Sequence, residues 1–441
     1  GCFGGLSASM ARRAMGSLRA PYSRLRRRGG FFPGPGSSPG SASFRAGSSS
    51  ASSDQKLRDP CLLLSNDDGV EAPGLLVLAE RLRLSTGMRC VVVAPDGDRS
   101  GAGMALTLRQ PMALKERPDL GPDVYAVGGT PADCALCALD PGRGLLASLG
   151  LTPKLMVSGI NAGPNLGFDV LFSGTFGAAR TGAMFGVPSV AASLAAAPEA
   201  SGGSPPAPAD FSHAAQGLGA LVWFLLGGLE GASAPPGSSS YPRPDQAPGA
   251  PDRRYAPGGF QLMQEGARSG VPGAWELPQD AASLRLLLGN AFRRADVLLN
   301  VNVPPGWELN SSKWGGGGGF APAGLGVSQY RGTLKTLEGG SGYVTGSGEY
   351  YVDPDVAGCD ISTVRSGKAA VSTLQTWPEG HALCLGEAVM AAAHEAGDGG
   401  MPAWITEMAS SASGTSGDVP VWMDPSNPPP PPPPPPNEGG V

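Results

Sequence analysis

The sequence predicts an α/β fold in which a mostly parallel sheet carries helices on both faces. Between residues 61 and 193, short apolar runs without helical period alternate with segments of helical period. Alternation of this kind is typical of parallel sheets with crossover helices. Residues 327–337 and 343–353 instead alternate apolar and polar side chains. This second pattern predicts an antiparallel hairpin arm in the C-terminal part of the chain.

The first predicted strand, residues 61–65, ends in an acidic loop that contains Asn66, Asp67 and Asp68, and Pro73 starts the following helix. In an open parallel sheet, ligands bind beyond the carboxyl ends of the strands. Two adjacent carboxylates at such a place repel each other. A divalent cation such as magnesium, manganese or calcium, held by oxygen ligands, compensates this repulsion. Taken alone, the tripeptide Asp67-Asp68-Gly69 is equally well explained as an Asx-type turn.

Polar loops also follow the other predicted strands, which comprise residues 89–94, 125–127, 155–158 and 187–193. Ser100 follows the first of these strands, and Asn161 and Asn165 follow the third. Ser173-Gly174-Thr175 opens the helix that precedes the last one. Together with the acidic loop, these residues offer oxygen ligands for a cation and backbone N–H donors for an anion. This combination indicates metal-assisted phosphate chemistry.

We expect one domain over residues 57–397, interrupted by low-complexity segments. These segments are a Pro/Ser/Gly/Ala loop at 196–209 and a Pro/Gly/Ser/Arg insertion at 227–280. Residues 398–441 are expected to form a disordered tail, which ends with the nine prolines of residues 428–436. The elements predicted between these segments are helices at 211–226 and 283–292 and a strand at 297–303.

Residues 1–56 have the composition of an organelle transit peptide. They carry eight arginines among Ser, Ala and Gly, and no acidic residue precedes Asp54. Segments of this composition direct proteins to chloroplasts or mitochondria. The alternative is a disordered basic tail without an address, on a chain that stays in the cytoplasm.

Composition argues against several other classes of protein. The formal net charge is −5 and no basic stripe is present, which argues against binding of a nucleic-acid polymer. No apolar run reaches the roughly 20 residues that a membrane-spanning helix needs. No GxGxxG follows the first strand, so a dinucleotide-binding dehydrogenase is disfavoured. Cys134 and Cys137 form a CxxC inside an apolar helical pattern, and without a second ligand pair we interpret them as buried thiols.

Six blocks in order resemble the SurE survival-protein family: LLLSNDDGVEAPG, VVVAPDGDRSGAG, VGGTPADC, VSGINAGPNLG, SGTFGAA and NVNVPP. The resemblance is close over residues 61–193 and returns around residues 300–302 and from Asp360 onward. It implies a Rossmann-like core and a metal-dependent 5′-nucleotidase that acts on nucleoside monophosphates.

By position, the resemblance also implies roles for individual residues. The implied ligands of the divalent metal, magnesium or manganese, are Asp67, Asp68, Ser100 and Asn161. The residues expected around the phosphate are Asn66, Asn165, Ser173, Gly174 and Thr175. One of the two aspartates is expected to serve as the catalytic base or nucleophile as well. Ser100 has a simpler alternative as a helix N-cap or turn serine.

The chain departs from the family pattern at three places. Thr181 stands where the family usually carries a glutamate. The region between residues 193 and 295 is much longer than in the family. Residues 306–351 match only loosely; in the family this region forms a projecting hairpin used in subunit exchange, which implies a homodimer or homotetramer.

The leading hypothesis is a phosphomonoesterase that hydrolyses nucleoside 5′-monophosphates with a magnesium or manganese ion. One alternative is a broader phosphatase that acts on short polyphosphate or other monoesters. Another is a catalytically silent nucleotide-binding protein of the same fold. The chain retains all four implied metal ligands, and two unneutralised carboxylates would be an electrostatic liability. Both points favour an active enzyme.

Overall fold

The computed structural model describes residues 59–195, 207–230, 280–309, 319–331, 334–337, 342–345, 349–352, 356–378 and 384–413. All of them fall within the unit Leu57–Val441. The predicted transit peptide and the polyproline segment lie outside the described residues, as does most of the loop at 196–209 and of the insertion at 227–280.

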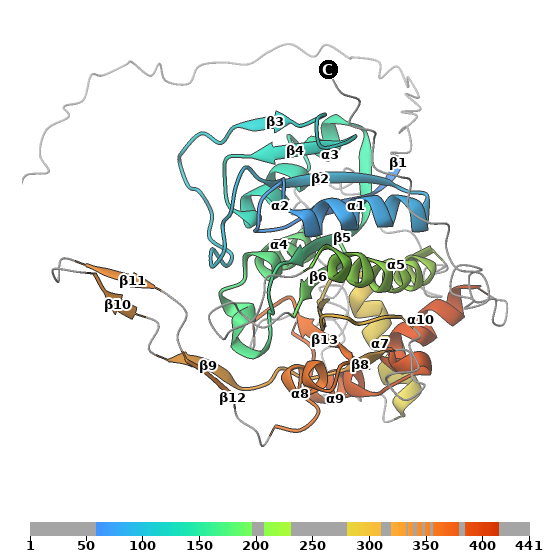
Figure 1. Cartoon of the computed structure of the whole chain (residues 1–441). Coiled ribbons are helices and arrows are strands. Elements are labelled where there is room, and N and C mark those ends of the chain that lie inside the picture. Colours follow the sequence, from blue (N-terminus) through green and yellow to red (C-terminus); the bar gives the residue numbers. More distant parts are fainter. Residues whose placement is uncertain are drawn as a thin grey trace, which may run out of the picture. The chain divides into compact units, whose positions relative to one another are not determined.

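A mostly parallel sheet forms the centre of the fold (Figure 1). Within the described residues it has nine strands, in the order β3-β4-β2-β1-β5-β6-β7-β13-β8. In chain order, its strands are β1 (Asp59–Ser65), β2 (Arg89–Pro95), β3 (Leu114–Glu116), β4 (Val124–Val127), β5 (Leu151–Asn161), β6 (Ser189–Leu194), β7 (Val297–Val303), β8 (Phe320–Pro322) and β13 (Ala369–Gln375). The pairs β3–β4 and β13–β7 are antiparallel, and the other pairs are parallel. The predicted α/β class is confirmed.

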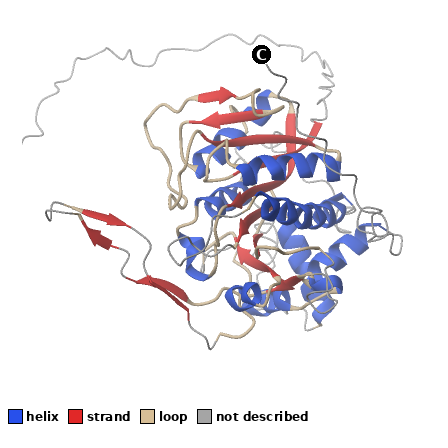
Figure 2. Ribbon diagram, in the orientation of Figure 1, coloured by secondary structure: helices blue, strands red, loops and turns tan. Residues whose placement is uncertain are grey.

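Helices lie on both sides of this sheet (Figure 2). They are α1 (Pro73–Thr86), α2 (Pro131–Leu139), α3 (Leu145–Ser148), α4 (Gly174–Met184), α5 (Pro208–Glu230), α7 (Ala281–Arg293), α8 (Asp360–Arg365), α9 (Glu387–Ala391) and α10 (Ala403–Ser413). Short 3-10 turns include η1 (Gly167–Leu171), η6 (Ala392–His394) and η7 (Asp398–Gly400). No helix in the described ranges is both long and apolar enough to cross a membrane.

Strand β1 shows why the core has two halves. Its last five residues, 61–65, are buried on both faces, as is typical of a central parallel strand. Leu62 and Leu64 belong to the apolar cluster that includes α1 and α5. Cys61 and Leu63 point the other way, into a cluster that includes Cys134 of α2. Cys134 is a buried free thiol with a pKa raised by burial, as the apolar pattern around the CxxC predicts.

The C-terminal arm consists of two short antiparallel pairs. One pair is β9 (Ser328–Arg331) with β12 (Glu349–Val352), and the other is β10 (Leu334–Thr336) with β11 (Tyr343–Thr345). Both pairs fall inside the two segments whose apolar–polar alternation predicts a hairpin. The expected antiparallel arm is therefore confirmed.

The prediction that order ends at residue 397 is wrong. Helix α10 packs Trp404, Ile405 and Met408 into the core, and the Trp404 ring lies 5.5 Å from the Phe292 ring between centroids. These residues share one helix face because they are spaced by about one turn. The apolar stripe is short and follows a glycine-rich turn, which concealed it in the sequence. Helix α5 likewise extends to Glu230, beyond the predicted end at residue 226.

Candidate active site and metal centre

The candidate site lies beyond the carboxyl ends of β1, β2 and β5, which are neighbours in the sheet. The loops that follow these strands are tied to each other through the backbone. Val70 donates to the Pro95 carbonyl at 2.8 Å, and Arg99 donates to the Asp67 carbonyl at 2.7 Å. Glycine is required where the first two loops meet, because Gly69 has a φ of +105° and a Cβ there would lie 3.0 Å from Gly97. The predicted acidic loop is thus fixed against the loop of Ser100.

Asp67 lies at the centre of the site and is almost completely buried. Its Oδ2 accepts a hydrogen bond from the Gly174 N–H at 3.1 Å, and its Oδ1 accepts one from the Thr175 hydroxyl. Both donors belong to the first turn of α4, whose positive dipole end favours a nearby carboxylate. Any Cβ at position 174 would lie 2.8 Å from the Asp67 Cβ, so this approach requires glycine.

Asp68 and Asn161 complete the centre of the site. The Ala162 N–H donates to Oδ2 of Asp68 at 3.2 Å, which places Asp68 beside the residue that follows Asn161. The Thr175 hydroxyl oxygen, bonded to Asp67, also lies 3.4 Å from Oδ1 of Asn161. The structure therefore brings three of the four predicted metal ligands together.

Ser100, the fourth predicted ligand, is exposed and bonded to a residue that the sequence did not single out. Its hydroxyl donates to Oδ1 of Asp98 at 2.6 Å, and its N–H donates to the same oxygen at 2.8 Å. This is an Asx turn, so Ser100 has the turn geometry of its simpler alternative. The hydroxyl oxygen still has lone pairs with which to approach a cation.

The residues assigned to the phosphate differ in their surroundings. The Asn165 amide nitrogen donates to the Ser193 hydroxyl at 2.7 Å, and the Asn165 carbonyl accepts from Asn300 and Asn302 at 2.9 and 3.0 Å. Asn165 is therefore a crosslink between the β5 loop and strands β6 and β7. Ser173 caps α4 by accepting from the Phe176 N–H at 3.0 Å. The contacts of these residues with phosphate stay predictions.

The surroundings of Asp67 and Asp68 raise the pKa values of both carboxyls. Burial is the main cause that raises the pKa of Asp67, although the hydrogen bond from Thr175 opposes it. Burial, followed by the charge of Asp67, raises the pKa of Asp68 to about 7, and the charge of Asp98 acts in the same direction. Two adjacent carboxylates, one buried and one half-buried, are unfavourable together, and a divalent cation would offset that penalty.

The residues present fit a hard divalent cation. The described part of the chain contains no group of three or more His, Cys, Asp and Glu side chains arranged to hold a metal. The site therefore depends on two carboxylates and the neutral oxygens of Asn161 and Ser100, a donor set that suits magnesium, manganese or calcium. In addition, Oδ1 of Asn66 is buried without a hydrogen-bond partner among the described residues, while its Nδ2 donates to the Gly69 carbonyl at 2.8 Å. An acceptor in this state is available to a cation or its bound water.

Thr181, at the position of the usual family glutamate, lies on the buried side of α4. Its hydroxyl donates to the Gly177 carbonyl at 2.8 Å, within the same helix. Thr181 therefore satisfies its own polar group without reaching another element.

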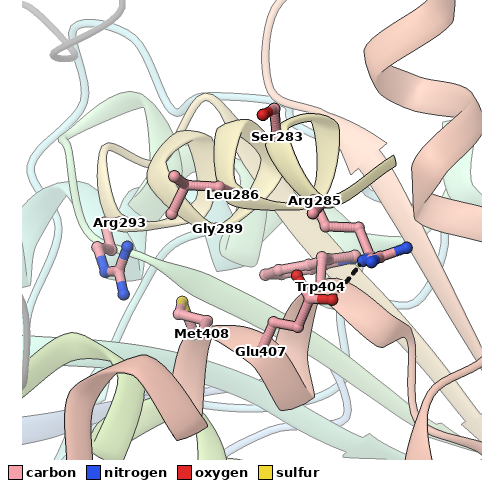
Figure 3. A pocket seen from close by; sticks show the side chains of 9 residues that line it. Ser283, Arg285, Leu286, Gly289, Arg293, Trp404, Glu407 and Met408 are labelled. Atoms are coloured by element: carbon pink, nitrogen blue, oxygen red, sulfur yellow. Dashed lines mark hydrogen bonds and ion pairs between the residues drawn. The ribbon is translucent and has the colours of Figure 1, made fainter. Parts of the chain in front are cut away.

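A separate hollow of about 260 Å³ lies between α7 and α10 (Figure 3). Its charged groups are already engaged: Arg285 pairs with Glu407 and with Glu395, and Arg293 donates to the Gly228 carbonyl at 3.0 Å. None of the predicted site residues lines it. It offers paired charges rather than a reactive group, so we do not assign chemistry to it.

Comparisons with known proteins point to one family. The model of the family described as "Survival protein SurE" matches residues 62–317. The 5′-nucleotidase SurE of Alkalilimnicola ehrlichii is 50% identical over 133 residues, which cover 30% of this chain and 48% of that protein. The 5′-nucleotidase SurE of Caldanaerobacter subterraneus subsp. tengcongensis is 44% identical over 134 residues, which cover 30% and 50%.

A solved structure, the SurE protein from Aquifex aeolicus, aligns with 73% of this chain and 95% of that chain, at 24% identity and a TM-score of 0.42. The chain spans about half the length of the curated relatives it matches.

Proposed function

The chain belongs to the SurE family, and from this premise we propose that it is a metal-dependent phosphomonoesterase that hydrolyses nucleoside 5′-monophosphates to nucleoside and phosphate. The observation that carries the proposal is the pair of adjacent aspartates at the carboxyl end of β1, of which Asp67 is buried and is held against the first turn of α4. The names of the curated relatives support the 5′-nucleotidase assignment.

The proposed metal ligands are Asp67, Asp68, Ser100 and Asn161. When bound, a magnesium or manganese ion supplies Lewis acidity at the phosphoryl oxygen and lowers the pKa of a bound water. The protein supplies orientation and burial. The first turn of α4 directs its donors toward Asp67, so a phosphate bound there would share these donors with the carboxylate.

Asp68 is the better proton acceptor of the two aspartates. Both carboxylate oxygens of Asp67 already accept hydrogen bonds from the first turn of α4. The described hydrogen bond to Asp68 engages only Oδ2, which faces the Ala162 N–H. Its other oxygen is therefore better placed to receive the proton of the attacking water.

The direct test is phosphate release by the full chain from nucleoside 5′- and 3′-monophosphates, ribose 5-phosphate and polyphosphate. Each is assayed with magnesium, with manganese and with a chelator. Asp68→Asn should reduce release from 5′-monophosphates by at least about 100-fold, whereas Asp119→Asn, at an exposed ion pair with Arg117, should not. Equal activity with the chelator would contradict the metal dependence. Nucleotide binding without any release would identify the silent binding protein instead.

The arm supports a proposal about assembly. Leu334 and Leu337 at β10 and Val344 in β11 are exposed, although they are large and apolar. We propose that a second copy of the chain covers them in a homodimer or homotetramer. Sedimentation should show a smaller species when Leu334 is changed to Glu. An unchanged mass would remove the arm from the interface.

A further inference from the structure

Two phenylalanines, Phe168 in the 3-10 helix η1 and Phe172 directly after it, are exposed to solvent immediately before α4. Phe168 is 50% exposed and Phe172 is 68% exposed, whereas Val170 between them is buried. Exposed aromatic rings in so short a segment are unusual on a protein surface without a ligand or partner. The question is what the more exposed ring contacts.

Phe172 is fixed between the two loops that build the candidate site. It directly precedes Ser173, the N-cap of α4, whose first turn binds Asp67. Its carbonyl accepts a hydrogen bond of 2.9 Å from the N–H of Gly103, which lies three residues after Ser100. The backbone of Phe172 therefore joins residues 173–175, which are proposed to bind phosphate, to the loop that contains Ser100, a proposed metal ligand.

The segment that carries Phe172 is held rigidly. The N–H groups of Phe172 and Ser173 both donate to the Asp169 carbonyl, at 3.0 and 2.9 Å. At the start of η1, the Gly167 N–H donates to Oδ2 of Asp360 at 2.9 Å. A Cβ at Gly167 would lie 2.6 Å from the Ser328 hydroxyl, so η1 fits closely against the base of the arm. A surface ordered before binding loses less entropy when a ligand arrives.

We propose that Phe172 is the platform on which the base of the nucleoside monophosphate stacks. This inference rests on the proposed function and adds a specificity-determining residue to it. One ribose separates the base of such a substrate from its phosphate, so a phosphate at the first turn of α4 leaves the base close to the adjoining Phe172. Every nucleobase has a π face, and stacking on an aromatic ring is tolerant of base identity. The site therefore favours nucleotides over phosphate esters without a base, and it discriminates weakly among the bases.

Phe168 provides the matched control. It has the same side chain, is also exposed and lies in η1, which Phe172 directly follows. However, it lies four residues before Phe172 and is correspondingly farther from Ser173 along the chain. If only a general apolar surface mattered, the two phenylalanines would contribute alike.

The test compares adenosine 5′-monophosphate with ribose 5-phosphate, which lacks the base. Phe172→Ala should raise the KM for adenosine 5′-monophosphate by about 10- to 100-fold and leave the KM for ribose 5-phosphate unchanged. Phe172→Tyr should restore the low KM, and Phe168→Ala should change neither value. Equal changes for both substrates, or from both alanine variants, would overturn the proposal.

Two further measurements, calorimetric binding and sedimentation, test this inference separately from the proposed function. Calorimetric binding of adenosine 5′-monophosphate, with magnesium present, reports stacking even if the chain releases no phosphate. Weaker binding by Phe172→Ala alone would then support the platform although the hydrolase assignment had failed. Phosphate release that is indifferent to Phe172 would retain the hydrolase and reject the platform. A lower mass in sedimentation for both alanine variants would assign the two rings to contact with a second copy and overturn the proposal.

Discussion

Two clusters of charged side chains in this molecule are built in opposite ways. Between α7 and α10, Arg285 lies 2.5 Å from Glu395 and 2.6 Å from Glu407, so opposite charges neutralise each other near the surface. Beyond β1, the buried Asp67 and the half-buried Asp68 are adjacent, and among the described hydrogen bonds to their carboxylates no donor is a cationic side chain. The first arrangement serves stability at most modestly, and the second opposes it. An arrangement that opposes stability is typical of a functional site.

Asp67→Asn should give the largest effect. It should also show most clearly that the Asp67 carboxylate serves activity rather than stability. Phosphate release should fall by at least about 100-fold, because a carboxylate ligand of the proposed cation is lost. The thermal midpoint of the metal-free protein should stay the same or rise, because a buried charge is removed from beside Asp68. Activity assays and thermal unfolding in a chelator measure the two effects. A variant that is both fully active and less stable would show that the carboxylate serves the fold.

Gly174→Ala tests the packing around Asp67, because it changes the space beside the carboxylate and leaves its charge unchanged. The added methyl group would lie 2.8 Å from the Asp67 Cβ and 2.9 Å from Pro131, so the first turn of α4 must move away. We expect a loss of about 1–3 kcal/mol in the free energy of unfolding, together with reduced phosphate release.

Gly227→Ala, in α5, is the control for this substitution. A Cβ there meets no atom of the described residues within 4 Å, so alanine should stabilise the helix by about 0.5–1 kcal/mol. Denaturant unfolding of both variants measures the difference. Equal effects would mean that the contact between α4 and Asp67 is not tight.

The sequence predicts the sheet and the loops of the site because their signals are local. Strand β7, at Val297–Val303, coincides with the predicted strand. Asp67, Asp68 and Asn161 were placed together because the carboxyl ends of neighbouring parallel strands share one edge. Three of the four predicted metal ligands meet there. In each case a few adjacent residues contain the whole pattern.

Features that depend on contacts distant in sequence were missed. Asn165 is held by Asn302, 137 residues away, and no local pattern announces that contact. The role of Asp98 depends on which way the Ser100 hydroxyl turns, although the Asx-turn composition around Asp98 was an available signal. Helix α10 was missed because its helical character rests on burial of Trp404 against other elements rather than on local propensity.

Asp169 tests whether a buried carboxylate away from the proposed ligands behaves like the pair at the site. Burial raises its pKa from 3.8 to about 6, and the charge of Asp360 acts in the same direction. A carboxyl whose folded-state pKa is raised contributes stability below its unfolded pKa and loses that contribution as pH rises. The contribution of Asp169 to the free energy of unfolding should therefore fall between about pH 4 and 6, by roughly 1 kcal/mol per pH unit at most.

Asp169→Asn should make this part of the pH profile less steep, because the titrating carboxyl is removed, while the amide oxygen can still accept from the Leu166 N–H. Denaturant unfolding at intervals across the range measures both proteins. A slope that persists in the variant would assign the pH dependence to other carboxyls.

Arg285→Met should give the smallest effect. It tests the cluster of paired charges between α7 and α10. The variant loses the ion pairs with Glu395 and Glu407, but both glutamates are more than 40% exposed and remain solvated. We expect the thermal midpoint to fall by about 2 °C or less, with phosphate release unchanged. Glu407→Gln in the same background should add little, because the pair is already broken. A large loss of phosphate release would mean that the paired cluster also supports the site, and the contrast between stabilising and functional charges would no longer hold.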